Sequence, residues 1–65
     1  MNHVCVAIDG KSYPGTFTVA RRLLTVTTIY GSRTTEAGPA PHQALARIML
    51  GELVREQLRK QNKGG

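Results

Sequence analysis

The segment from Pro41 to Lys60 is the only long stretch of the chain with the pattern of a helix. Its apolar residues recur at spacings of three and four, which places them on one side of a helix of about five turns. These residues are Leu45, Ala46, Met49, Leu50, Leu53 and Val54. Because such a helix is stabilised mainly by packing of its apolar side, the rest of the chain must cover that side.

Strands joined by tight turns precede this helix in the predicted fold. The alternation of Val4, Val6 and Ile8 with smaller residues is typical of a half-buried strand. The pair Asp9-Gly10 favours a two-residue hairpin turn, and Ala20 to Leu23 closes a second hairpin. Both hairpins place the same side chains on the buried face, namely Val4, Val6, Ile8, Tyr13, Phe17, Val19, Leu24 and Val26.

The opposite face of this sheet is rich in threonine, with Thr16 expected opposite Thr27 and Thr18 opposite Thr25. A polar face is typical of an antiparallel sheet that is covered on one side. Its members are His3, Cys5, Ser12, Thr16, Thr18, Thr25 and Thr27. The chain is therefore predicted to be an α+β domain, with an antiparallel meander of three strands packed against a C-terminal helix.

A fourth strand is the alternative to this three-stranded sheet. Gly31-Ser32 favours a third turn, after which Arg33 to Glu36 would return beside the third strand. This returning segment has no large apolar residue, so the sequence leaves both sheets open.

A chain of 65 residues forms one domain, which we expect over residues 1–61, with a disordered tail over 62–65. A domain this small buries about 60% of its unfolded surface, so a disulfide, a metal or a partner chain usually adds stability. The single Cys5 excludes an intramolecular disulfide, and Cys5, His3 and His42 do not match a zinc spacing. We expect no cofactor, and oligomerisation is the source of added stability that the sequence leaves.

The sequence offers few groups for catalysis. Glu52 and Glu56 lie one helical turn apart, but Arg55 and Arg59 beside them indicate a solvated helix face rather than a paired-carboxylate site. Cys5 has no base at a fixed spacing that would activate its thiol. A short chain also offers little concave volume for a substrate. We therefore expect neither an enzyme nor a small-molecule substrate.

The self-association hypothesis rests on one border of the apolar side of the helix. Leu50, Val54 and Leu58 diverge from the central stripe of Leu45, Met49 and Leu53. A three-stranded sheet would cover that stripe and leave the border exposed, and exposed apolar patches mark interfaces. The sequence thus predicts a protein-interaction module that forms a homodimer through its helix. The alternative is a sheet that twists enough to cover the whole apolar side within one chain.

Nucleic-acid binding is the second hypothesis. The formal net charge is +5, from nine Lys and Arg and four Asp and Glu, and such a balance favours polyanionic partners. Basic residues at the expected turns, together with the threonine face, would give a surface for phosphates and bases. These residues are Lys11, Arg21, Arg22 and Arg33. No exposed aromatic platform for single strands is expected, because Tyr13 and Phe17 belong to the core.

The expected location is the cytoplasm. No apolar run is long enough to span a membrane, and the start of the chain lacks the pattern of a signal peptide. A single thiol fits a reducing compartment. We expect no membrane partner.

The motifs placed above carry a resemblance to known proteins. They are Asp9-Gly10-Lys11, Tyr13, Gly15, Tyr30-Gly31-Ser32, Thr34-Thr35, Leu45-Ala46-Arg47 and Glu52-Leu53-Val54. Through them the chain resembles, nearly end to end, short bacterial proteins of the conserved-hypothetical type, a resemblance that implies no activity. The order of three strands and a helix also resembles the plant ethylene-response type of DNA-binding domain in topology. The chain lacks that family's Trp and Arg pattern along the strands.

Overall fold

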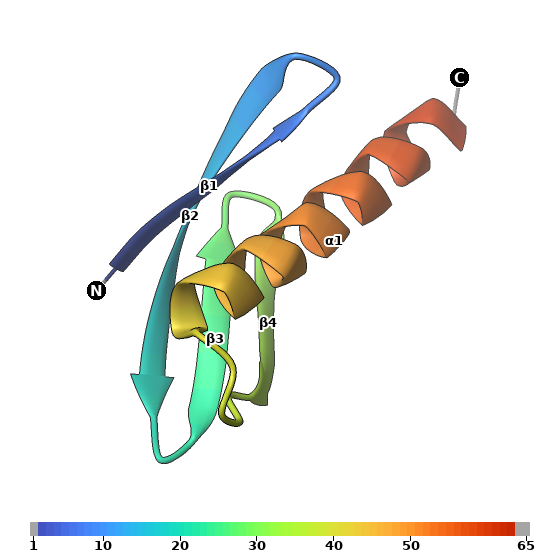
Figure 1. Ribbon diagram of the computed structural model, residues 1–65. Coiled ribbons are helices and arrows are strands. Elements are labelled where there is room, and N and C mark those ends of the chain that lie inside the picture. The colour runs from blue at the N-terminus through green and yellow to red at the C-terminus, as the bar shows by residue number, and fades with distance from the viewer. Residues whose placement is uncertain (1, 64–65) are drawn as a thin grey trace.

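The computed structural model describes residues 2–63 as a four-stranded antiparallel sheet with one helix packed on one face (Figure 1). The strands follow the chain in the order β1-β2-β3-β4. Their bounds are β1 Asn2–Ile8, β2 Lys11–Ala20, β3 Leu23–Thr28 and β4 Gly31–Glu36, followed by α1 His42–Lys63. The predicted α+β fold is confirmed, and the alternative with a fourth strand is the one that the chain adopts.

The first two hairpins have the predicted register. Val6 lies opposite Tyr13 in the first hairpin, and Phe17 lies opposite Val26 in the second. Thr16 faces Thr27 on the outer side, as expected. At the first turn Asp9 and Gly10 have φ values of 52° and 80°, the left-handed conformation that a two-residue turn between twisted strands requires. The Asp9-Gly10 turn and the shared alternation of buried side chains therefore account for the pairing of three strands.

The second turn has the same conformation with an unusual pair of residues. Arg21 and Arg22 have φ values of 51° and 68°. The left-handed region costs about 1–2 kcal/mol for a residue with a Cβ, and Asn-Gly is the pair that normally occupies it. The Arg22 carbonyl accepts a 2.7 Å hydrogen bond from the Ala37 amide, which ties this turn to the segment before α1. Two exposed arginines thus occupy an unfavourable backbone conformation.

The third turn lies two residues earlier than predicted. Thr28 pairs with Gly31, so Ile29 and Tyr30 form the turn, and Gly31 and Ser32 belong to β4. The Thr28 hydroxyl accepts a 2.9 Å hydrogen bond from the Tyr30 amide and donates one of 3.2 Å to the Gly31 carbonyl. Gly31 has a φ of 141°, so glycine serves the first residue of the strand rather than the turn itself.

The apolar side of α1 packs on the sheet around a row other than the predicted stripe, of which only Met49 is buried. Leu50 and Val54 are both 0% exposed, whereas Leu45 and Leu53 are half-buried at the margin. The prediction that Leu50 and Val54 form an exposed border is therefore wrong, and the twisted sheet covers that row within one chain. Leu58, the third residue of the border, is half-buried against the same core.

Close approach between helix and sheet explains why Leu50 lies at the centre. A Cβ on Gly15 of β2 would lie 3.1 Å from Leu50 Cδ1, which is tighter than ordinary contact. The missing side chain at Gly15 thus makes the space that Leu50 fills. The rest of the buried core comprises Val4, Phe17, Leu24, Val26, Ala37, Ala46, Met49 and Val54.

The helix begins and ends slightly later than predicted. Pro41 precedes its first residue, and the Pro41 carbonyl accepts a 3.1 Å hydrogen bond from the Leu45 amide. At the other end α1 continues to Lys63, so residues 62 and 63 belong to the helix rather than to the predicted tail. The rest of that tail, residues 64–65, lies outside the described residues. Among the described residues, no helix is both long enough and apolar enough to cross a membrane.

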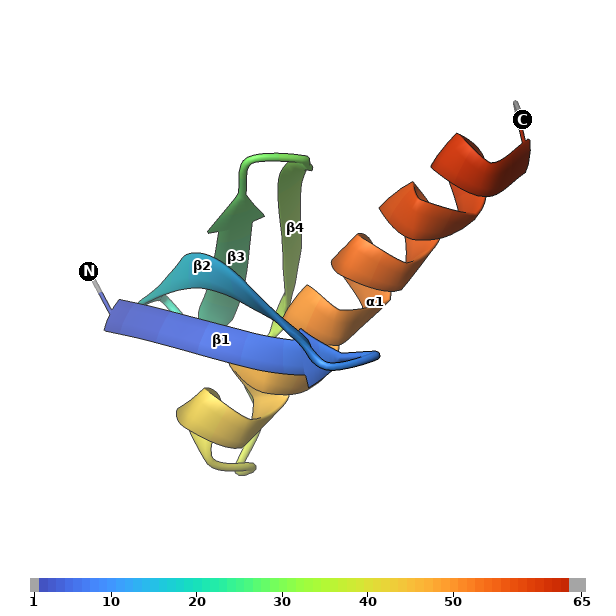
Figure 2. The ribbon, with the colours of Figure 1, turned by 90° about the horizontal axis from the view of Figure 1, so that it is seen from above.

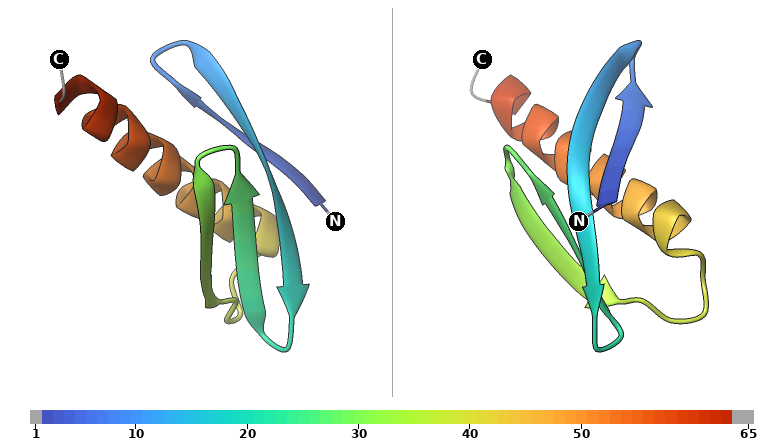
Figure 3. Two further views of the ribbon diagram at one scale, coloured as in Figure 1. Left: turned by 180° about the vertical axis from the view of Figure 1, so that it is seen from behind. Right: turned by 90° about the vertical axis from the view of Figure 1, so that its left-hand side faces the viewer.

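The arrangement of α1 and of the first two turns determines which side chains can lie together. The helix and β1 run in the same general direction, and the C-terminal turns of α1 extend beyond the sheet (Figure 1 and Figure 2). The β1–β2 turn and the β2–β3 turn lie at opposite ends of the long, curved strand β2 (Figure 3). Side chains at these two turns are therefore far apart.

Candidate nucleic-acid interface

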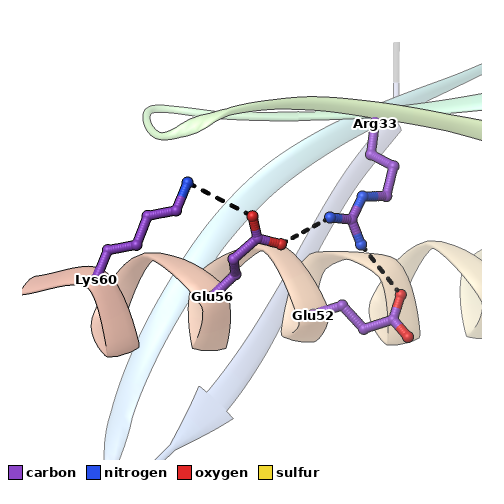
Figure 4. Close-up of polar contacts among 4 residues, drawn as sticks. All are labelled: Arg33, Glu52, Glu56 and Lys60. Atoms are coloured by element: carbon purple, nitrogen blue, oxygen red, sulfur yellow. Dashed lines mark hydrogen bonds and ion pairs between the residues drawn. The ribbon is translucent and has the colours of Figure 1, made fainter. Parts of the chain in front are cut away.

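Arg33 belongs to an ion-pair cluster between β4 and α1 (Figure 4). It pairs across the ladder with the buried Val26, so its side chain lies on the helix side of the sheet. Its guanidinium lies 3.5 Å from Glu52 Oε1 and donates a 2.9 Å hydrogen bond to Glu56 Oε2. Lys60 Nζ lies 3.6 Å from the other oxygen of Glu56. The sequence predicted that Arg33 belongs to a free basic surface. In the structure its charge is instead paired with Glu52 and Glu56.

The electrostatics of this cluster lower the pKa of one carboxyl group. The hydrogen bond from Arg33, followed by the positive charges of Lys60 and Arg33, holds the pKa of Glu56 below its ordinary value of 4.5. Both partners are substantially exposed, so the cluster is solvated rather than a buried catalytic pair. Glu52 and Glu56 thus neutralise cations, which agrees with the expected charged helix face.

Of the other three predicted nucleic-acid residues, Lys11 lies far from Arg21 and Arg22. Lys11 starts β2, whereas Arg21 and Arg22 follow its last residue, and ten strand residues separate these ends by roughly 30 Å. Lys11 also pairs with Ile8, on the helix side of the sheet, rather than on the threonine face. The structure therefore does not gather Lys11, Arg21, Arg22 and Arg33 into one basic surface.

The outer face of the sheet carries hydroxyl groups rather than cations. Thr16, Thr18, Thr25, Thr27 and Thr34 alternate with positions that face the helix along β2, β3 and β4. The hydroxyls of Thr25 and Thr34 share a hydrogen bond of 2.8 Å across the strands. Within the described strands, no Lys or Arg has the parity of this face.

Three arginines on α1 form a basic surface that the sequence analysis missed. Arg47, Arg55 and Arg59 are exposed, and none has a carboxylate within 4.0 Å among the side chains that the structure describes. Together with Gly51 they occupy every fourth position, which makes a continuous row, and we call the three residues the arginine row. This spacing was the signal that could have found them.

The arginine row starts beside β1 and turns outward along the helix. Arg47 lines a groove with His3, Val4 and Cys5 of β1. A Cβ on Gly51 would lie 3.8 Å from Val6 Cγ2, so the next position of the row faces β1 as well. Because a row of every fourth residue drifts around the helix, the positions of Arg55 and Arg59 are rotated progressively away from β1. They border the hollow that holds Arg33, Glu52 and Glu56.

The described residues contain little that would suit other chemistry. They include no group of three or more His, Cys, Asp or Glu side chains that could hold a metal ion. Cys5 is an exposed free thiol on the outer face of β1. Of the three aromatic residues, Phe17 is buried and Tyr13 and Tyr30 are half-buried. No aromatic platform for stacking bases is therefore present in residues 2–63.

Comparisons with family models, with curated proteins and with solved structures found no match to this chain. The resemblance to short bacterial proteins and the cytoplasmic location stay predictions. Function must be argued from the charges and surfaces of the chain itself.

Proposed function

We propose that this protein binds nucleic acid through the exposed side of α1, with the arginine row contacting phosphates. The observation that carries the proposal is the contrast in charge pairing along this helix. Glu52 and Glu56 are already engaged by Arg33 and Lys60, whereas the three guanidiniums of the row have no carboxylate within 4.0 Å in the described side chains. The helix thus presents three guanidiniums that form no ion pair with a described carboxylate, although Arg55 and Arg59 share a hollow with Glu52 and Glu56.

The chemistry of the row suits a phosphate backbone. A guanidinium is always charged and donates paired N–H groups that match phosphate oxygens. Arg55 and Arg59 lie about 6 Å apart along the helix axis, and Arg47 lies about 12 Å before Arg55. Three cations distributed in this way can engage separate phosphates of one strand.

The surface favoured by the sequence supports this function less well. The threonine face offers hydroxyl groups but no cations, and the electrostatic contribution dominates non-specific binding to nucleic acid. Its hydroxyls would donate hydrogen bonds only after another surface had attracted the polyanion. We therefore assign the phosphate contacts to the helix.

Salt-dependent binding tests the function. Each phosphate contact that releases a counterion adds about 0.9 to the slope of log K against log salt, so three contacts predict a slope of about −3. The measurement is fluorescence anisotropy of a labelled generic duplex of 20 base pairs, titrated with the full chain between 25 and 200 mM salt. Binding weaker than about 100 μM at the lowest salt would reject the proposal.

A pair of matched variants tests the site. The first replaces Arg47, Arg55 and Arg59 by Gln, and the control replaces Lys11, Arg21 and Arg22 by Gln. Each variant loses three positive charges, so the two variants differ only in the position of the lost charges. We expect the helix variant to lose tenfold or more in affinity and most of the salt slope, and the control to lose threefold or less. Equal losses would mean that net charge alone drives binding.

A further inference from the structure

The two edges of the sheet differ in their protection against pairing with another chain. Natural edges are commonly blocked by charged side chains, by proline or by a bulge. β4 carries Arg33, whose side chain points inward, and Glu36. β1 contains no Lys, Arg, Asp, Glu or Pro, and its seven residues pair with β2 without a bulge. β1 is therefore an open edge that lacks these usual obstacles.

The register of the first hairpin identifies the unpaired backbone groups. In a two-residue hairpin the residues beside the turn, Ile8 and Lys11, form a hydrogen-bonded pair, and the pattern then alternates. His3, Cys5 and Ala7 consequently direct their N–H and C=O groups away from β2. The His3 carbonyl accepts a 3.3 Å hydrogen bond from Gln43 Nε2, as this assignment requires. The edge thus presents three residues for a new ladder.

We propose that a second copy of this chain pairs with β1 in antiparallel orientation and extends the sheet across a two-fold axis. Pairing all seven residues places Asn2 opposite Ile8, His3 opposite Ala7 and Val4 opposite Val6 of the second copy. Cys5 then lies on the axis opposite its own copy. This register matches the odd-numbered residues, which hold the free groups, with one another. The His3 carbonyl, which accepts an exposed hydrogen bond from Gln43, would instead accept one from the backbone of the second copy.

A second copy suits this edge because the strand is complementary to itself. With no Lys, Arg, Asp or Glu in β1, the pairing places no like charges opposite each other in the ladder. Val4 and Val6 face the helix side, so the new strand covers the half-buried Val6 with apolar surface. A 65-residue domain also gains stability from a partner chain. This edge replaces Leu50, Val54 and Leu58 as the self-association surface.

The positive charge of Arg47 opposes the pairing and makes the self-association depend on salt. Arg47 lies beside His3 and Cys5, so the two copies bring their Arg47 side chains toward each other near the axis. Salt screens this repulsion, and self-association should therefore strengthen as salt rises. Nucleic-acid binding should weaken over the same range. The two proposals thus respond to salt in opposite directions, and either can fail without the other.

Sedimentation velocity of the reduced full chain at 50–200 μM, in 50 and 500 mM salt, tests the pairing. The monomer has a mass of 7.1 kDa, so a dimer has about 14 kDa, which is twice that value. We expect a dimer fraction that increases at least threefold at the higher salt. Monomer alone at both salt concentrations overturns the proposal.

Two lysine variants locate the interface. Cys5→Lys places two cations opposite each other on the axis, and Thr34→Lys adds the same charge to the exposed face of β4. Circular dichroism of both variants serves to check that they keep the fold. We expect the first to abolish the dimer and the second to retain it, and equal disruption by both overturns the assignment to β1.

A short bismaleimide gives a second readout that needs no charge change. It should link two Cys5 thiols into a covalent dimer, because the proposed register places them directly opposite. The control Cys5→Ser/Thr34→Cys moves the thiol to β4 and should remain monomeric. Linkage that is equal at the two positions overturns the register.

Discussion

The ion-pair cluster and the arginine row lie on the same helix but differ in what their cations contact. In the cluster, Arg33 from β4 reaches Glu52 and Glu56, and Lys60 completes the neutralisation. In the row, Arg47 lies beside β1, which contributes no acidic residue. The comparison shows that the number of cations in a chain does not determine how many are free to bind. The distance of each cation from Glu52 and Glu56 decides that.

Side-chain parity on the two edge strands contributes to the difference. Arg33 pairs with Val26, which directs its side chain toward the helix and its glutamates. On β1 the corresponding positions are Val4 and Val6, which pack against the core. One edge thus adds charge to the helix and the other adds apolar surface.

The largest effect on stability is expected from Leu50, the buried residue that packs α1 on the sheet. Leu50→Ala removes a fully buried side chain that fills the space above Gly15, so we expect a loss of about 2–5 kcal/mol in the free energy of unfolding. Urea denaturation measures this loss. Ile48→Ala, at a position that is 61% exposed, is the control and should change stability by about 0.5 kcal/mol or less. Similar losses at both sites would contradict the packing.

The next largest effect concerns arginines outside both regions. Replacing Arg21-Arg22 by Asn-Gly removes the cost of two left-handed arginines, so we expect the free energy of unfolding to rise by about 1–2 kcal/mol. Asp9→Asn at the first turn, where Gly10 already follows, serves as the control and should have little effect. If the Asn-Gly variant is no more stable than the parent, the two arginines carry no backbone strain.

A smaller effect separates binding from stability. Arg55→Gln should reduce the salt slope of duplex binding by about 1 and leave the urea midpoint unchanged, because no acid lies within 4.0 Å of Arg55 in the described side chains. Arg33→Gln should lower the midpoint, because it leaves Glu52 and Glu56 without their shared partner. Anisotropy and urea denaturation of the two variants make the comparison. A lower midpoint for Arg55→Gln would show that the row is also structural.

The smallest effect is a dependence of stability on pH. Since the folded pKa of Glu56 lies below 4.5, the folded state holds this carboxylate more strongly ionised than the unfolded chain does. The resulting stabilisation is present above pH 4.5 and is lost as the pH falls through the folded value. Thermal unfolding between pH 3 and 7 should show a shallower acid loss for Glu56→Gln than for the parent. Parallel curves would exclude a contribution from the cluster.

Much of the fold was predictable because it depends on local chemistry. Asp9-Gly10 fixes the first turn, and the alternation of apolar residues fixes which face of each strand is buried. The third turn was placed wrongly because Gly31 suggested a turn, while the Thr28 hydroxyl stabilises one at Ile29 and Tyr30 instead. The fourth strand could not be decided from its own residues, since Arg33 is held by contacts with the helix.

The sequence by itself determined the strand alternation, the first two hairpin registers and the existence of one amphipathic helix. The physical reason is that each depends on residues within a few positions of one another. Only the tertiary structure decided that Leu50 and Val54 face the sheet, because rotation of a helix with a wide apolar side depends on the twist of the strands beneath it. The same rotation brings Glu52 and Glu56 to Arg33 and leaves Arg47, Arg55 and Arg59 exposed.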